Sequence, residues 1–167
     1  MSVLTTARLT LRPAAVRDLE PCSAFWASER SRQMGGPWTP EETARSLDDV
    51  IAQWDRHGFG LFTAFLNGTP IGGIGPFFPE THPEPEIGWS LWDAALEGRG
   101  LAFEAAHAAR DWFFASTGRT TIVSYTDPDN HRSNRLCERL GAVIDAGAAH
   151  PYQEPTRVWR HTAGGAP

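Results

Sequence analysis

The sequence lacks any apolar run long enough to cross a bilayer, and residues 1–8 lack the charged and apolar regions of a signal peptide. It holds only two cysteines, Cys22 and Cys137, which are too few for a disulfide framework. It also lacks internal repeats, linkers and low-complexity blocks. We therefore expect one domain over residues 1–167, a reduced cytoplasmic setting and no membrane partner.

An excess of positive charge is missing as well. The formal net charge is −5, from 15 Lys and Arg against 20 Asp and Glu. Because nucleic acid is bound by basic surfaces, we expect no nucleic-acid partner. One basic tract, Arg132, Arg135 and Arg139, leaves room for a local anion site. The fractions of hydrophobic residues (41%) and charged residues (21%) are those of an ordinary globular domain.

Hydrophobic periodicity predicts an α+β domain with a mostly antiparallel, mixed seven-stranded sheet and about four helices. Asn67-Gly68 marks a tight hairpin, and Thr39-Pro40-Glu41-Glu42 a capped helix start. The long helix between the fourth and fifth strands is a crossover, which makes that pair parallel. The strands are expected at 7–12, 59–66, 70–77, 86–92, 120–126, 143–146 and 157–161, the helices at 14–28, 40–57, 98–116 and 130–140, and a mobile tail at 162–167.

One stretch points to a ligand site from its residues alone, without comparison to any known protein. The strand that begins at Glu86 runs through Trp92 into a loop, and Gly98-Arg99-Gly100-Leu101-Ala102 opens a helix. Glycines let a backbone approach a ligand closely, and the free N–H groups of a first helical turn face an anion. The pattern favours a pyrophosphate cradle over a plain flexible turn. Arg99 is equally consistent with a residue that contacts a phosphate and with a solvated surface charge.

Four stretches, at residues 6–13, 86–89, 98–105 and 130–142, resemble the GNAT superfamily of acetyl-CoA-dependent N-acyltransferases. Within it the chain looks like the ribosomal-protein N-terminal acetyltransferases, the RimJ/RimL-like branch. The cofactor motif of the superfamily, Gln/Arg-x-x-Gly-x-Gly/Ala, reads Glu97-Gly98-Arg99-Gly100-Leu101-Ala102 here. Glu97 departs from that motif, and an acid at this position is expected to weaken cofactor binding electrostatically.

The resemblance implies the GNAT fold, with the strands at 86–92 and 120–126 splayed apart. It places the pantetheine arm of acetyl-CoA on the exposed edge at Ser90, Leu91 and Trp92, where a backbone N–H polarises the thioester carbonyl. The pyrophosphate then lies on residues 98–102. Asn130 caps the next helix and touches the arm, and no metal is implied. Ser133 and Cys137 lie near the cofactor.

The catalytic groups are less determined. Ser133 is either the proton donor to the departing thiolate or a first-turn hydroxyl in water. Cys137 stands where many superfamily members carry Tyr, but a thiol is a weak donor, and a small buried apolar residue is the favoured interpretation. Glu86 is the first choice for the base that deprotonates the acceptor ammonium. Glu80, His82 and Glu84 are alternatives that would act through water, or are ordinary surface groups.

Two functions remain open at this point, with a third that is poorly supported. The first is transfer of an acetyl group to a primary amine, on a protein N-terminus or a small molecule, by a monomer or homodimer. Residues 34–38 and the helix behind them would form the acceptor wall. The second is an acyl-CoA-binding module without turnover. The third, a thiol hydrolase built on Cys137, needs a paired His, and His131 is six positions earlier in the sequence.

Overall fold

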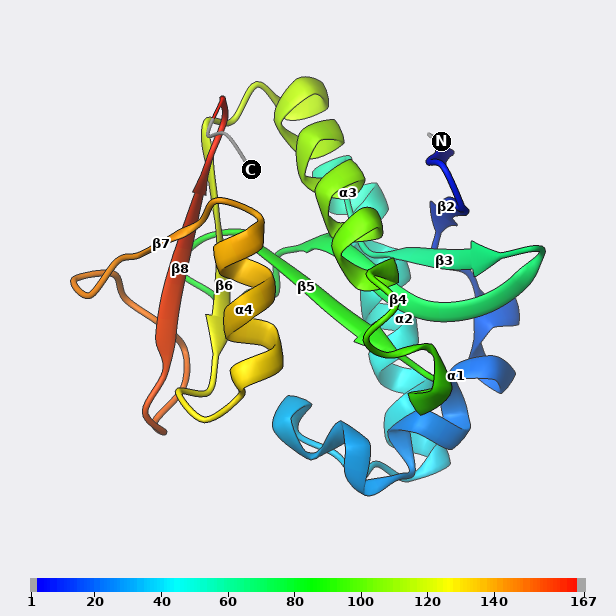
Figure 1. Ribbon diagram of the computed structural model, residues 1–167. Helices are drawn as coiled ribbons and strands as arrows, with labels where there is room; N and C mark the ends of the chain where they lie inside the picture. The colour runs from blue at the N-terminus through cyan, green and yellow to red at the C-terminus, as the bar shows by residue number, and fades with distance from the viewer. Residues whose placement is uncertain (1–2, 165–167) are drawn as a thin grey trace.

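In the computed structural model, which describes residues 3–164, eight strands form one sheet in the order β1-β2-β3-β4-β5-β6-β8-β7 (Figure 1). Paired neighbours are antiparallel except β5 and β6, which run parallel. The strands are β1 (Leu4–Thr5), β2 (Leu9–Pro13), β3 (Phe62–Leu66), β4 (Thr69–Phe77), β5 (Glu86–Leu91), β6 (Thr121–Thr126), β7 (Val143–Ile144) and β8 (Arg157–Thr162).

Helices cover both faces of this sheet. The structure contains α1 (Leu19–Trp26), α2 (Pro40–His57), α3 (Leu101–Thr117) and α4 (His131–Arg139), with 3-10 helices η1 (Val16–Asp18), η2 (Glu29–Met34) and η3 (Ala94–Leu96). Arg110 of α3 donates to the carbonyl of Leu140, and Arg139 of α4 lies 4.3 Å from the ring of Phe103 of α3. These contacts hold α3 and α4 side by side on one face, in front in Figure 1, while α2 lies behind the sheet.

The expected elements are present, and the hairpin and α2 are confirmed in detail. Asn67 and Gly68 have positive φ of 51° and 81°, as a two-residue hairpin turn requires. The Thr39 side chain accepts from the N–H of Glu42, whose carboxylate accepts from the N–H of Thr39. Gly58 ends α2 with φ of 73°.

The expected strand count and several boundaries are corrected. The eighth strand is the two-residue β1, which is too short to show alternation. The helix expected at 14–28 is divided into η1 and α1. Asp18 accounts for the division, because its carboxylate accepts from the N–H of Ala15 and from the Arg12 guanidinium at the turn. Thr162, expected in the tail, pairs with Thr121 in the sheet, whereas residues 165–167 lie outside the described part.

The parallel pair is the irregular part of the sheet. β5 and β6 share one register pair, Glu86 with Val123, within residues 3–164. One further contact follows, from the Ser124 hydroxyl to the carbonyl of Ile87 at 2.7 Å. Beyond it the strands diverge, and α4 lies over the diverging ends (Figure 1). The splay that the resemblance implies is therefore present, and it leaves one edge of β5 open toward its carboxyl end.

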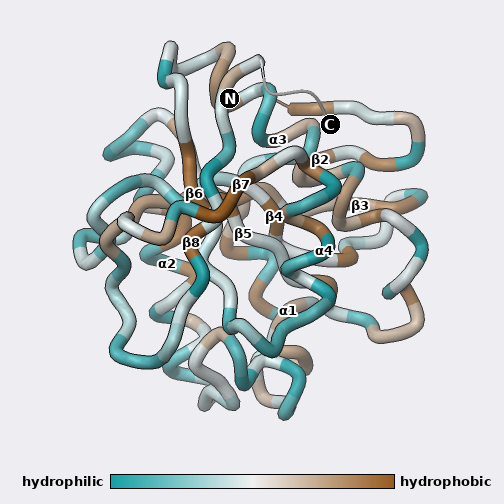
Figure 2. The backbone as a smooth tube through the Cα atoms, turned by 60° about the vertical axis from the view of Figure 1, so that its left-hand side comes forward, coloured by the Kyte–Doolittle hydropathy of each residue, from teal (hydrophilic) through white to brown (hydrophobic). Residues whose placement is uncertain are grey.

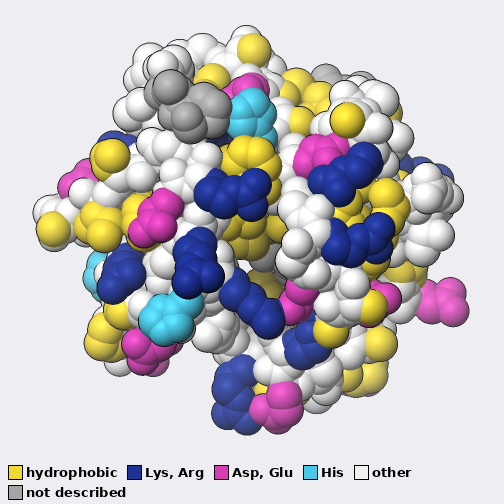
Figure 3. Space-filling model, in the orientation of Figure 1, with side chains coloured by type: hydrophobic (Ala, Val, Ile, Leu, Met, Phe, Trp, Pro, Cys, Tyr) yellow, Lys and Arg dark blue, Asp and Glu magenta, His cyan; other side chains and the backbone are white. Residues whose placement is uncertain are grey.

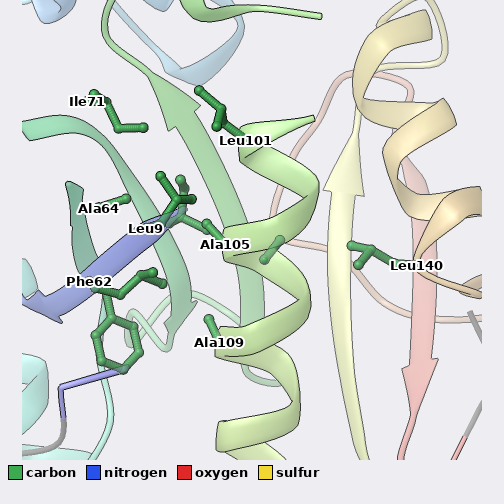
Figure 4. Packing of buried hydrophobic residues seen from close by; sticks show 11 residues of the cluster. Leu9, Phe62, Ala64, Ile71, Leu101, Ala105, Ala109 and Leu140 are labelled. Carbon is green, nitrogen blue, oxygen red and sulfur yellow. The ribbon is translucent and has the colours of Figure 1, made fainter. Parts of the chain in front are cut away.

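The core lies between α3 and strands β2 to β4. Leu101, Ala105 and Ala109 of α3 face Leu9, Ala64 and Phe62 (Figure 4), and all of these are at most 2% exposed. The alanines let the helix axis approach the sheet closely. Figure 2 shows brown, hydrophobic segments at β6 and β7, whereas much of the loop backbone is teal or white. This packing fixes the N-terminus of α3 at the end of β5.

Candidate active site

The predicted cradle forms the N-terminus of α3. Gly98 and Gly100 have positive φ of 74° and 76°, a region that glycine adopts without strain. Gly100 is the N-cap of α3, and its carbonyl accepts from the N–H of Glu104, which is the first bond within the helix. The N–H groups that precede this bond point out of the helix end, where the helix dipole favours an anion. Leu101 is buried in the core, so it anchors the cradle.

Arg8 lies beside this cradle, which the sequence argument did not identify. Its Nε donates to Glu104 at 2.6 Å, and its Nη1 donates to the carbonyl of Arg99 at 3.0 Å. Glu104 also accepts from the Thr6 hydroxyl at 2.6 Å. The segment before β2 is thereby bound to the first turn of α3. The available signal was that Arg8 belongs to the first of the four similar stretches.

The open edge of β5 presents its main chain with a definite alternation. The carbonyl of Ile87 points toward β6, since it accepts from Ser124, so the peptide groups of Trp89 and Leu91 point the same way. The N–H of Trp92 points to the opposite side and donates to Ile71 of β4. Of the three residues predicted on the edge, Leu91 therefore turns its main chain to the splay, whereas Ser90 and the N–H of Trp92 face β4. The carbonyls of Leu91 and Trp92 both accept from the Arg30 guanidinium.

The first turn of α4 faces that edge. Asn130 is its N-cap, and the Asn130 side chain accepts from the N–H of Ser133 at 3.2 Å. The indole N–H of Trp89 donates to the Ser133 hydroxyl at 3.2 Å, across the gap from β5 to α4. With its oxygen engaged in this way, the Ser133 O–H remains available as a donor. Trp89 is a second residue that the sequence argument missed in this role.

Glu86 and His82 form a buried pair where β5 and β6 part. Their side chains are 9% and 8% exposed, and Nε2 of His82 lies 3.0 Å from the Glu86 carboxylate. Burial raises the pKa of Glu86, and the hydrogen bond with His82 opposes that rise. Nδ1 of His82 lies 3.3 Å from the exposed Thr81 hydroxyl, which gives the pair a connection to solvent. A carboxyl group with a raised pKa and a proton path is suited to general-base chemistry.

The other predicted carboxylates on this loop lie elsewhere. Glu84 accepts two hydrogen bonds from Arg160, at 2.8 and 2.9 Å, and Arg160 also binds Asp145. Glu80 is 92% exposed. Glu84 therefore holds β8 to the loop, and Glu80 is a solvated charge.

Cys137 is fully buried within α4 and packs with Ala142 and Trp159. Burial raises its pKa to about 12, so it carries almost no thiolate at neutral pH. Its polar neighbour is the Ser124 hydroxyl, and His131 is exposed at the start of the helix. This arrangement matches the interpretation of Cys137 as a small core residue.

The opposite face of β5 carries the segment predicted as an acceptor wall. Trp26 and Trp38 stack with ring centroids 4.0 Å apart, and Trp38 donates its main-chain N–H to Trp26. A cavity of about 70 Å³ lies between α1, α2 and the sheet, and Trp26, Ser90 and Trp92 are among the residues that line it. Met34 to Trp38 thus lies at the rim of this face.

Arginines surround the hollow on the α3 and α4 face, where dark blue side chains gather in Figure 3. Arginines of this region have different anchors: Arg8 binds Glu104, Arg139 lies over Phe103, and Arg132 binds Glu97. Two residues of the tract in α4, Arg132 and Arg139, are thus anchored, and a local anion site at this tract stays a prediction.

Comparison with known proteins agrees with this geometry. The acetyltransferase (GNAT) domain family matches residues 8–143. An acetyltransferase from Agrobacterium tumefaciens str. C58 is 38% identical, with a TM-score of 0.91 over 98% of this chain and 95% of its own. This chain belongs to the GNAT acetyltransferases.

Two further GNAT structures share the fold. A protein described as a GnaT-family acetyltransferase from Bordetella pertussis is 28% identical, with a TM-score of 0.81 over 98% of this chain and all of its own. RimL, a ribosomal L7/L12 α-N-protein acetyltransferase determined with coenzyme A, is 15% identical, with a TM-score of 0.79 over 99% of this chain and 100% of its own. No helix of this GNAT protein between residues 3 and 164 is long and apolar enough to span a membrane.

Proposed function

We propose that this GNAT protein transfers an acetyl group from acetyl-CoA to a primary amine by direct attack within a ternary complex. The observation that carries the proposal is the opening between β5 and β6, which leads at the end of β5 to the two-glycine cradle of α3. The opening offers a strand edge to an extended amide-containing arm, and the cradle offers N–H groups to a pyrophosphate.

The residues around the cradle fit such a donor. The N–H groups of the α3 first turn, from Gly100 to Ala102, would hold the pyrophosphate, with Arg8 and Arg99 as adjacent positive charge. The N–H groups of Trp89 and Leu91 face the splay, where one of them would bind the thioester oxygen as negative charge develops on it. The side chain of Ser133 lies at the same gap, beside the Asn130 cap.

The chain supplies a proton path for each half of the reaction. Glu86 accepts a proton from the acceptor ammonium, through water or directly, and His82 passes it toward Thr81 and solvent. The free amine then attacks the thioester carbonyl carbon, the carbon–sulfur bond breaks, and coenzyme A leaves as its thiolate. The nitrogen loses its second proton as it becomes an amide, and that proton replaces the one taken up by the thiolate. Ser133 lies on the arm side of the gap, and its O–H is the candidate donor to that thiolate.

The acceptor is an amine that reaches the α1 and α2 face of β5. We propose a protein N-terminus, in keeping with the RimJ/RimL-like resemblance and with the fold shared with RimL, and a small amine is the other outcome that the assay below distinguishes. The excess of acidic residues over the whole chain favours a cationic acceptor.

Titration calorimetry with acetyl-CoA tests the donor site. We expect wild-type binding and at least about a tenfold weaker affinity for Gly100→Glu, because a carboxylate then occupies the anion cradle. Gly118→Glu is the matched control, since Gly118 ends the same helix with φ of 69° and has open space around it. No binding by the wild type, or equal binding by Gly100→Glu, would refute the cradle assignment.

Turnover separates an enzyme from a binding module. N-terminal peptides and small amines are incubated with the protein and labelled acetyl-CoA, and acetylated product is measured. Every one of the 15 residues counted as Lys or Arg is arginine, so the protein itself contributes only its α-amino group to background labelling. Product on any acceptor supports the proposal, and binding without turnover across the panel supports the module.

A further inference from the structure

Glu97 is the residue at which this chain departs from the superfamily motif, and it is not isolated. Its carboxylate accepts from Nη2 of Arg30 at 2.7 Å and also pairs with Arg132. Arg30 belongs to η2, on the acceptor side, and Arg132 belongs to the first turn of α4, on the donor side. A single carboxylate at the edge of the cradle therefore joins two segments that border different substrates.

The Arg30 arm of this bridge is well anchored. Besides Glu97, its guanidinium donates to the carbonyl of Trp92 at 2.6 Å and to the carbonyl of Leu91 at 2.9 Å. The Arg30 side chain is 32% exposed, and its guanidinium lies 5.2 Å from the ring of Phe25. Three acceptors fix a planar guanidinium in position and orientation, so η2 is held against the end of β5.

The Arg132 arm is weakly held. Its side chain is 82% exposed, and among residues 3–164 it pairs with Glu97. Exposed ion pairs contribute little to stability and exchange readily, especially for a more highly charged anion. A pyrophosphate on the adjacent cradle would compete with Glu97 for Arg132, whereas Arg30 has two backbone carbonyls that a ligand phosphate cannot replace.

We propose that Glu97 is a positioning residue that couples donor binding to the acceptor side. Without donor, its carboxylate is shared between Arg30 and Arg132. With donor phosphate in the cradle, Arg132 pairs with the phosphate, and Glu97 then pairs with Arg30 alone. The stronger ion pair between Glu97 and Arg30 holds η2 and the adjoining Trp26–Trp38 stack more firmly against β5. The proposal rests on the function proposed above, since it needs a phosphate-bearing donor in the cradle.

The proposal predicts that one substitution at Glu97 strengthens the binding of acetyl-CoA and weakens the binding of the acceptor. Glu97→Gln, which restores a motif residue, removes a negative charge beside the cradle, so acetyl-CoA should bind about threefold more tightly. The same change removes a charged partner of Arg30, so η2 should loosen and the KM of the acceptor should rise. A residue with only a structural role would weaken both substrates together.

Hydrogen exchange of the η2 backbone, with and without acetyl-CoA, is the test. The reporters are the amides of Ser31, Gly35 and Gly36, which donate within the η2 segment. In the absence of ligand we expect about fivefold faster exchange in Arg30→Gln and Glu97→Gln than in the wild type. The matched control is Arg32→Gln, because Arg32 is in the same helix but, within residues 3–164, pairs with the exposed Glu29 alone.

In the wild type, acetyl-CoA should slow exchange at these amides about twofold, and Glu97→Gln and Arg132→Gln should abolish this response. Two results would overturn the inference. One is an exchange rate in wild-type η2 that does not change when acetyl-CoA binds. The other is an exchange rate in Arg30→Gln that is as slow as that in Arg32→Gln. If the wild type binds no acetyl-CoA at all, the proposed function fails, and the unliganded variants still decide whether Glu97 and Arg30 position η2.

Discussion

At the scale of single residues, Glu86 is the group on which the proposed chemistry depends most. It was the first choice from the sequence because of its place at the start of a strand that enters the cradle loop. The structure shows two features of Glu86 that the sequence does not predict, namely the burial of its carboxyl group and its contact with His82. His82 lies four positions earlier, in a proline-rich loop whose path no periodicity predicts.

The first prediction concerns this pair. Glu86→Gln should lower kcat by about 10²–10³ because a general base is lost, and the exposed Glu80→Gln on the same loop should leave kcat within about twofold. Since burial raises the pKa of Glu86, and the base must be ionised, kcat/KM should rise with pH through a value above that of an ordinary carboxyl group. If the pH profile of kcat/KM for Glu86→Gln kept the same fall at low pH as the wild type, the base would be another residue.

The second prediction concerns the thiols. Burial raises the pKa of Cys22 to about 11 and that of Cys137 to about 12, so neither should react quickly with Ellman's reagent at pH 8 in the folded protein. Both should react on unfolding in guanidinium. Cys137→Ala should retain acetyl transfer, because the thiol has no chemical step. Rapid labelling of native Cys137, or loss of transfer in the alanine variant despite an unchanged melting temperature, would contradict this assignment.

At the scale of elements, a buried polar contact marks where the sheet opens. The single hydroxyl proton of Ser124 goes to the carbonyl of Ile87, so Nε2 of His161 on β8 donates to the Ser124 oxygen, at 3.0 Å. Nδ1 of His161 is buried without a partner in the described residues. β5, β6 and β8 are thus joined through one side chain at the last point before β5 and β6 separate.

The third prediction follows from that contact. Burial lowers the pKa of His161 to about 4, from 6.5, so the unfolded chain takes up a proton between these values and the folded protein does not. The free energy of unfolding should therefore fall as pH decreases from 6.5 to 4, by up to about 3 kcal/mol from this residue. Urea denaturation over this range should show a shallower decline for His161→Gln, whereas the exposed His150→Gln should follow the wild type.

Elements that local chemistry specifies were predicted well. The capping box at Thr39, the Asn67-Gly68 turn and the periodicity of the long helix are encoded within a few residues, and all are present. The short β1 and the division of the first helix were not predicted. β1 depends on pairing with β2, and η1 ends where Asp18 binds Arg12 and Thr63 from other strands.

At the scale of the whole molecule, some residues of the proposed site lie in continuous motifs and others come together only in the fold. The cradle, Asn130 and Ser133 come from continuous motifs, so the sequence indicated them. Arg30 meets Glu97 across 67 positions, and Arg8 meets Arg99 across 91, and such pairs exist only once the sheet has formed. A net charge of −5 likewise conceals the arginines that surround the hollow between α3 and α4.

The central claim is that the opening beside β5 and the cradle of α3 form one continuous donor site. A crystal structure of the protein with coenzyme A tests it most directly. We predict pyrophosphate density within hydrogen-bond distance of the α3 N-terminal amides at Gly100 to Ala102, and an extended arm between β5 and the first turn of α4, near Leu91 and Ser133. The account would be contradicted if coenzyme A bound on another surface. It would also be contradicted if side chains filled the gap between β5 and α4 and the cradle held no pyrophosphate.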